Sequence, residues 1–208
     1  MRIVLILVFL SSLQLTAQDI SFSTEIRDST IHIEEDSELV SKLMFYVSDL
    51  QLETKDGEFL EMDSYYLIDF GDSRSLLIKD VNPDKKEIKS IQFKLGIDSI
   101  TNVSGAFGGA LDPTKGMYWS WQNGYINFKM EGNVNDEDYV LHLGGYMSHF
   151  KSVQQVVLPV LNRSIEFKII LPLNELLEKV IPEDNTVMSP SLEAVAISKR
   201  IASTFYLK

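Results

Sequence analysis

The amino-acid sequence predicts an all-β fold: an antiparallel, Greek-key-like β-sandwich with one short helix and a C-terminal helix packed on the sheet. Apolar and polar residues alternate along residues 91–97 and 165–171, which is the period of a half-buried strand. Short segments of this kind are separated by turn residues at regular intervals, as is typical of sandwiches. The length of 208 residues, with 45% hydrophobic and 24% charged residues, is compatible with one globular domain.

Residues 1–18 have the pattern of a signal peptide. A positively charged start is followed by an apolar run at residues 3–10, and cleavage is expected near Ala17 or Gln18. The apolar run is too short to span a bilayer. We therefore expect residues 19–208 to form a single exported domain, periplasmic or secreted, that does not insert into a membrane.

The exported part of the chain is predicted to be mostly strands. We expect them at residues 45–52, 58–62, 64–70, 75–80, 91–97, 139–143, 153–160 and 165–171. Lys55-Asp56-Gly57 lies between the first two of these segments and predicts a hairpin turn.

Two late segments are predicted to be helical. Residues 173–180 form a short helix that Pro182 ends. A longer helix opens near residues 189–193, with Pro190 close to its first position. Its apolar residues share one stripe that should dock on the sheet: Leu192, Val195, Ile197, Ile201 and Phe205.

A tryptophan-rich hairpin is predicted in the middle of the chain. Asn123-Gly124 lies between two alternating runs and indicates a two-residue type I′ turn. This turn would fix the register, so that Trp119 faces Phe128 and Trp121 faces Ile126. Both tryptophans would then lie on the buried face, and replacing either by alanine would cost about 3–5 kcal/mol. The opposite face is expected to be solvated and carries Tyr118, Ser120, Asn127 and Lys129.

The composition excludes several classes of function. There are 30 acidic residues against 19 Lys and Arg, a formal charge of −11, which works against binding to nucleic acid or to an anionic membrane surface. With no cysteine, disulfides and thiolate metal sites are excluded. The sequence also lacks the Gly-x-Ser-x-Gly, His-Glu-x-x-His and phosphate-loop motifs, so we do not expect an enzyme.

The segment at residues 109–132, GALDPTKGMYWSWQNGYINFKMEG, resembles the signature of the MbnP-like family. This is an exported copper-binding family associated with methanobactin operons and widespread in Bacteroidota. Further segments agree with it in the expected order: FYVSDLQL at residues 45–52, HLGG at residues 142–145 and VMSP at residues 187–190. The resemblance covers nearly the whole exported part and implies the Bacteroidota branch of the family.

The resemblance implies a copper site. Characterised relatives hold one copper ion with histidine nitrogen and with a kynurenine that a dihaem peroxidase makes by oxidising a tryptophan. Trp119 and Trp121 match the Trp-x-Trp motif, and His142 matches the histidine of the His-Leu-Gly-Gly segment. Which tryptophan would be modified stays open. This chain lacks histidine at two positions where many relatives carry it, in the first strand (residues 20–26) and at residues 184–185.

The three histidines of the chain differ in how well they could serve as copper ligands. His149 follows His142 by seven residues, and the glycines at residues 144–145 between them could bring the two rings together. Imidazole nitrogen suits copper. The alternative is that His142 makes a local hydrogen bond and that His149 lies on a loop. We interpret His32 as an ordinary strand residue.

Calcium is the competing metal, because residues 133–138 are rich in carboxylate and amide oxygens. Their spacing fails the EF-hand pattern, so we interpret them as a solvated loop.

Two hypotheses follow from the sequence. The first is an exported copper-binding protein with His142, His149, Trp119 and Trp121 at the metal. The second is an exported, non-enzymatic binding or structural module of the same fold that has lost the metal.

Overall fold

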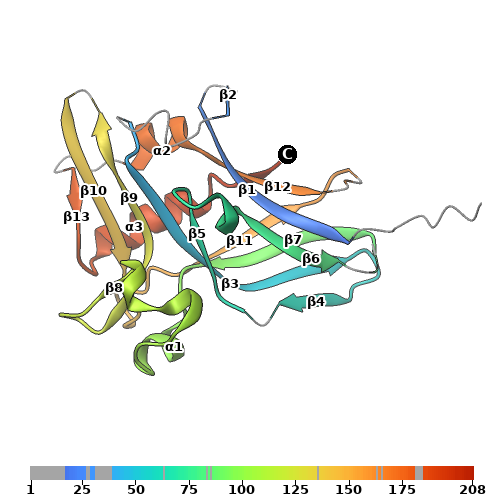
Figure 1. Cartoon of the computed structure of the whole chain (residues 1–208), viewed down its shortest axis with the longest axis horizontal. Coiled ribbons are helices and arrows are strands. Elements are labelled where there is room, and N and C mark those ends of the chain that lie inside the picture. The colour runs from blue at the N-terminus through green and yellow to red at the C-terminus, as the bar shows by residue number, and fades with distance from the viewer. Residues whose placement is uncertain are drawn as a thin grey trace, which may run out of the picture.

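The computed structural model describes residues 17–26, 29–30, 39–62, 64–82, 84, 86–134, 136–162, 164, 166–180 and 185–208. Residues 1–16 of the predicted signal peptide, His32, Pro182 and Asp184 lie outside these ranges. The described chain forms two β-sheets with helices beside them, so the predicted sandwich is confirmed (Figure 1).

The smaller sheet is centred on the first strand of the described chain. Its members are β1 (Gln18–Ile26), β2 (Ser29–Thr30), β6 (Leu77–Asn82), β12 (Phe167–Pro172) and β14 (Tyr206–Leu207). Strand β12 pairs with β1 in parallel, and β14 pairs with β12 at the edge. The chain therefore brings residues close to its two ends into one sheet.

The larger sheet has the order β11–β7–β3–β9–β10–β13. These strands are β3 (Lys42–Thr54), β7 (Ile88–Leu95), β9 (Gly124–Val134), β10 (Glu137–Gly144), β11 (Gln154–Pro159) and β13 (Thr186–Val187). Two short strands, β4 (Phe59–Met62) and β5 (Tyr66–Asp69), pair with β3, and β8 (Tyr118–Trp119) pairs with β9.

The described helices are short. They are α1 (Ser99–Val103), α2 (Leu173–Val180) and α3 (Leu192–Ala202), with 3₁₀ turns η1 (Ser73–Leu76), η2 (Gly109–Leu111) and η3 (Pro113–Lys115). The predicted short helix coincides with α2. The predicted longer helix is α3, although the Ser191 hydroxyl caps it by accepting from the Ala194 N–H, so Pro190 lies before the cap.

Two parts of the prediction are wrong in detail. The sheets are mixed, because β1–β12 and β10–β13 pair in parallel. Turn signals reveal only neighbours joined by a hairpin, which are antiparallel, and strands far apart in the chain need not obey that rule. In addition, Leu192 is exposed, whereas Ile197 and Ile201 of the same predicted stripe are fully buried.

The main core is organised around the ring of Phe45 in β3. Its centroid lies 5.8 Å from that of Phe22 in β1, 6.0 Å from that of Phe128 in β9 and 5.6 Å from that of Phe205 after α3. The Phe93 ring of β7 contacts both Phe22 and Phe205 edge-on. One cluster of rings therefore joins the two sheets and the C-terminal segment.

A second, smaller core covers the opposite face of the larger sheet. It consists of Met44, Tyr46, Ile97, Leu111, Met117, Trp119, Tyr125 and Ile126. Since Phe45 packs into the main core while Met44 and Tyr46 pack into the second one, β3 is buried on both faces. The covering layer is the segment from α1 to β8, seen at the lower left of Figure 1. No helix in the described ranges is long and apolar enough to cross a membrane.

Replacing Phe45 by alanine is expected to lower the free energy of unfolding by about 3–5 kcal/mol, because it leaves a cavity where both sheets and the α3 segment meet. Urea unfolding followed by circular dichroism measures the change. Phe59 in β4 is the matched control, because its side chain is 49% exposed. The Phe59→Ala change should stay within about 1 kcal/mol. Equal losses for the two variants would contradict this account of the core.

Candidate metal centre

Strand β10 places His142 on the face of the larger sheet that the second core covers. Its neighbours Leu141 and Leu143 point into the main core, and side chains alternate along a strand, so His142 points the other way. His142 is only 9% exposed. The alternation of His142 with Leu141 and Leu143 in the sequence indicates this orientation, on the less apolar face of the strand, but not the burial.

His142 is hydrogen-bonded to a carboxylate on the neighbouring strand. Its Nε2 lies 2.7 Å from Oε1 of Glu131 in β9. The ammonium of Lys129, directly opposite His142 in the β9–β10 ladder, lies 3.8 Å from the same oxygen and donates to the Gly116 carbonyl at 2.9 Å. These three side chains form a polar network between the sheet and its covering segment.

The charges of this network follow from its burial. Desolvation lowers the pKa of His142, and the hydrogen bond to Glu131 offsets this only in part. Burial alone would raise the pKa of Glu131, but the hydrogen bond from His142 and the charges of Lys42 and Lys129 outweigh it, so that pKa is lowered. Desolvation also lowers the pKa of Lys129. At neutral pH His142 is therefore a neutral imidazole beside an ionised carboxylate.

Trp119 lies on the same face of β10 as His142. It is 6% exposed, and its ring packs against Gly144, where a Cβ atom would stand 2.6 Å from Cζ3 of Trp119. Gly144 follows His142 by two residues, a rise of about 7 Å along the strand. The fold thus places one predicted tryptophan on the same face of β10 as the predicted histidine.

The predicted register of the tryptophan hairpin is wrong. Trp119 pairs with Gly124 and Tyr118 pairs with Tyr125, so the loop has four residues, Ser120–Asn123. Asn123 has the positive φ of a type I′ turn, at 49°, but Gly124 does not. Gly124 instead allows a close approach of the Tyr146 ring, whose Cε1 would lie 3.1 Å from an added Cβ.

The shifted register separates the two tryptophans. Trp121 lies in the loop and is 65% exposed, so its predicted place in the core is wrong. Its ring still contacts that of Trp119, with centroids 5.7 Å apart. Conversely, Asn127 and Lys129, which were predicted to be solvated, are buried. Asn127 accepts from the Ile97 N–H and donates to the Ser152 hydroxyl, and Lys129 donates to the Gly116 carbonyl of the covering segment.

His149 lies on an exposed loop beyond the end of β10. Nδ1 of its ring lies 3.1 Å from the hydroxyl oxygen of the adjacent Ser148. In the described ranges, no group of three or more His, Asp or Glu side chains is arranged to hold a metal ion. The structure therefore brings His142 and Trp119 to one face but does not assemble the four predicted residues into a ready site.

Sequence reasoning missed Glu131. The alternation of residues 125–130 and 139–143 around a polar turn could have revealed it, because it indicates an antiparallel β9–β10 pair. In that pair Glu131 and His142 are diagonal neighbours on one face. Of the oxygen-rich residues that follow, Asn133 and Asp138 pair near the end of the β9–β10 hairpin, and their side chains form a hydrogen bond of 2.9 Å.

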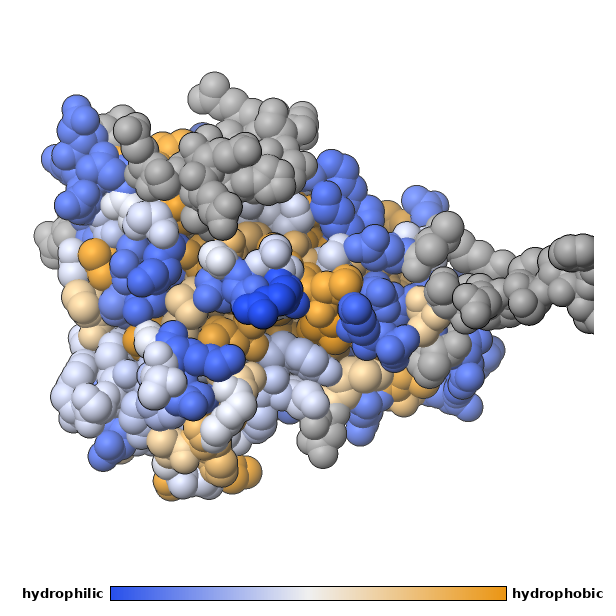
Figure 2. Space-filling model, viewed as in Figure 1, coloured by the Kyte–Doolittle hydropathy of each residue, from blue (hydrophilic) through white to orange (hydrophobic). Residues whose placement is uncertain are grey.

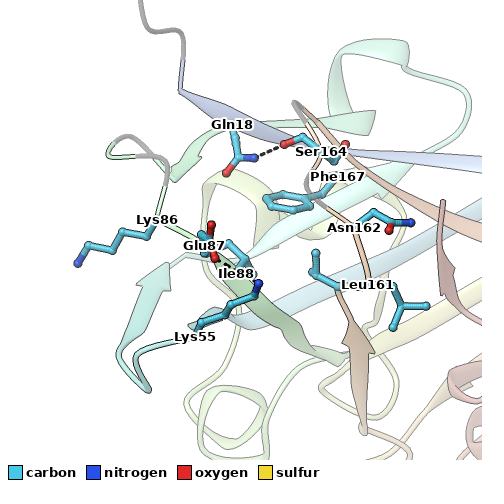
Figure 3. A pocket seen from close by; sticks show the side chains of 10 residues that line it. Gln18, Lys55, Lys86, Glu87, Ile88, Leu161, Asn162, Ser164 and Phe167 are labelled. Atoms are coloured by element: carbon cyan, nitrogen blue, oxygen red, sulfur yellow. Dashed lines mark hydrogen bonds and ion pairs between the residues drawn. The ribbon is translucent and has the colours of Figure 1, made fainter.

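A separate pocket lies at the other end of the molecule and contains none of the predicted site residues. It has a volume of about 420 Å³, and Figure 3 shows Phe167 between Gln18 and Leu161 at its centre. Its charges are already paired, because Lys55 lies 3.2 Å from Glu87. Lys86 similarly lies 2.6 Å from Glu58. This pocket offers no imidazole to a metal.

Apolar side chains also reach the surface near the covering segment. Ile100, Val103 and Phe107 are exposed on and after α1. Figure 2 shows hydrophobic residues gathered at this lower edge of the molecule.

A comparison with protein-family models identifies this arrangement. The model of MbnP matches residues 11–190, which is most of the chain. The chain belongs to the MbnP family. No curated protein matches it.

A solved structure of an MbnP protein has a similar fold. It is MbnP from Methylosinus trichosporium, with a TM-score of 0.52 and 12% sequence identity. The match covers 84% of this chain and 81% of that chain. At this identity the likeness concerns the fold, and it agrees with the β-sandwich described above.

Replacing Trp119 by alanine is expected to cost about 3–5 kcal/mol, since it removes a buried ring from the second core. The same change at the exposed Trp121 should cost less than about 1 kcal/mol. Chemical unfolding of both variants checks this asymmetry. A loss at Trp121 as large as that at Trp119 would support the two-residue hairpin that the structure replaces.

Replacing Gly144 by alanine is expected to displace the Trp119 ring and to destabilise the protein by about 1–3 kcal/mol. The displaced ring should meet water, so the tryptophan fluorescence should shift to longer wavelength. Gly108→Ala is the control, because nothing lies within 4 Å of an added Cβ there. Unchanged fluorescence in the Gly144 variant would mean that the ring does not rest on this glycine.

Proposed function

We propose that this member of the MbnP family is an exported, non-enzymatic copper-binding protein with His142 as its central ligand. The observation that carries the proposal is the position of His142, a buried imidazole on the same face of β10 as Trp119. Membership of the family supports the choice of copper. The Bacteroidota origin and the cleavage of the signal peptide are part of the same proposal.

The chemistry of His142 fits copper. Neutral imidazole is a good ligand for copper, and burial keeps this ring neutral near pH 7. Of its two nitrogens, Nε2 is hydrogen-bonded to Glu131, and Nδ1 makes no hydrogen bond to the described part of the chain. One nitrogen donor is therefore available on the face that Trp119 shares.

The remaining ligands would come from groups at the same end of β10. A carbonyl or amine from oxidised Trp119 would lie beside His142, because Trp119 already packs on Gly144. His149 could approach only by a change of its exposed loop. Exposed Trp121, in ring contact with Trp119, is the more accessible tryptophan for a dihaem peroxidase of the envelope. A bound copper ion could change its oxidation state or be passed to a partner, and His142 and oxidised Trp119 would hold it.

The second candidate function is an exported binding or structural module without a metal. It is favoured by the absence, in the described ranges, of three clustered His, Asp or Glu side chains. The exposed position of His149 points the same way. One experiment decides between the two functions.

Protein recovered from the periplasm, loaded with copper and freed of excess metal, is expected to retain about one copper ion per chain. His142→Gln should abolish retention, whereas His149→Gln should weaken it less, because His149 has no fixed place near the site. Metal analysis measures retention, and intact mass with and without a co-expressed dihaem peroxidase detects conversion of tryptophan to kynurenine. Wild-type protein that retains no copper under either condition would establish the metal-free module instead.

A further inference from the structure

We infer that Glu131 is a positioning residue: it holds His142 as the Nε2–H tautomer, so that Nδ1 is the nitrogen presented to a ligand. The inference rests on the proposed function only where it concerns copper. The tautomer itself is a property of the protein without metal.

The geometry of the β9–β10 ladder fixes the contact. His142 pairs with Lys129 and Val140 pairs with Glu131, so Glu131 is the diagonal neighbour of His142 on the same face. A diagonal neighbour lies within reach of a long side chain, and the 2.7 Å distance between Nε2 and Oε1 is that of a charge-assisted hydrogen bond. The contact therefore follows from the strand pairing rather than from a mobile loop.

The proton must lie on the histidine side of this hydrogen bond. An ionised carboxylate only accepts hydrogen bonds, and a neutral imidazole carries one N–H and one free lone pair. A carboxylate is ionised at neutral pH in ordinary surroundings, and Lys42, the partner of Glu131 in the β3–β9 ladder, and Lys129, whose ammonium lies 3.8 Å from Oε1, favour that form. Nε2 is consequently protonated, and the lone pair is on Nδ1.

The network also links this ring to the segment that carries Trp119. Lys129 donates to the Gly116 carbonyl, three residues before Trp119 in the covering segment. The backbone N–H of Ile126, close to Lys129 in β9, donates to the Met117 carbonyl at 3.0 Å. Hydrogen bonds thus link Glu131 to His142 and link β9, the strand that carries Glu131, to the segment that carries Trp119. This arrangement fixes the orientation of the His142 ring before a ligand binds.

A carboxylate in this position changes the ligand as well as its orientation. Carboxylates hydrogen-bonded to a metal-binding histidine raise its basicity, and their loss typically weakens metal affinity about 10–100-fold. If Nδ1 of His142 binds copper, Glu131→Leu should weaken copper binding by that factor. Glu131→Gln should lose less, because its amide oxygen can still accept from Nε2–H.

The direct test is nuclear magnetic resonance of the metal-free, full-length exported protein labelled with ¹⁵N at histidine. With three histidines in the chain, the spectrum is simple, and His142→Gln assigns the signal. Two-bond ¹H–¹⁵N correlations distinguish a protonated from an unprotonated ring nitrogen. We expect the Nε2–H tautomer in wild type and in Glu131→Gln, and a loss of the single tautomer in Glu131→Leu.

Glu53→Leu is the matched control. It removes another carboxylate from the larger sheet, one that accepts from Lys89 and Ser90 and has no contact with His142. It should leave the His142 signal unchanged, and thermal unfolding of all variants verifies that they are folded. An Nδ1–H tautomer in wild type, or an unchanged tautomer in folded Glu131→Leu, overturns the inference.

Copper titration of the same proteins separates the two proposals. If wild-type protein binds no copper while the tautomers behave as expected, the proposed function fails and the role of Glu131 in setting the ring stands. If wild type binds copper and Glu131→Leu binds it equally well with an unchanged tautomer, the proposed function stands and the role of Glu131 is refuted.

Discussion

The fold depends on the burial of the larger sheet on both of its faces. On one face, Phe45 of β3 joins the rings of Phe22, Phe128 and Phe205 and so ties both sheets to the C-terminal segment. On the other face, Met44 and Tyr46 lie beneath the segment that runs from α1 to β8. An antiparallel sheet usually leaves one face to water. Here the covering segment removes that face from solvent.

The covering segment changes the surroundings of the polar residues on this face of the sheet. Lys129, Glu131 and His142 would be ordinary surface groups on an open sheet, where exposed charge pairs contribute little. Here Lys129 and His142 are buried, so their polar groups need partners, which the Gly116 carbonyl and the Glu131 carboxylate supply. The result is a neutral histidine with one nitrogen hydrogen-bonded to Glu131, on the face of β10 against which Trp119 packs at Gly144.

The sequence predicted the elements well where a local signal was available. The Lys55-Asp56-Gly57 turn correctly placed β3 next to β4, and the helix at residues 173–180 matches α2. The family segment around Trp119 and Trp121 pointed to a family that the comparison then established. Apolar periodicity and turn residues act over a few positions, and these elements depend on nothing more distant.

Only the tertiary structure shows which segments far apart in the chain pair with each other. By itself, the sequence determined the all-β class, the β3–β4 hairpin and the face of β10 on which His142 lies. The parallel β1–β12 pair and the position of Trp119 on Gly144 depend on contacts between residues far apart in the chain. Asn123-Gly124 indicated a tight turn, but the packing of Tyr146 against Gly124 accompanies a longer one. The burial of His142 also could not be predicted, because burial is a property of what packs over a residue and not of the residue itself.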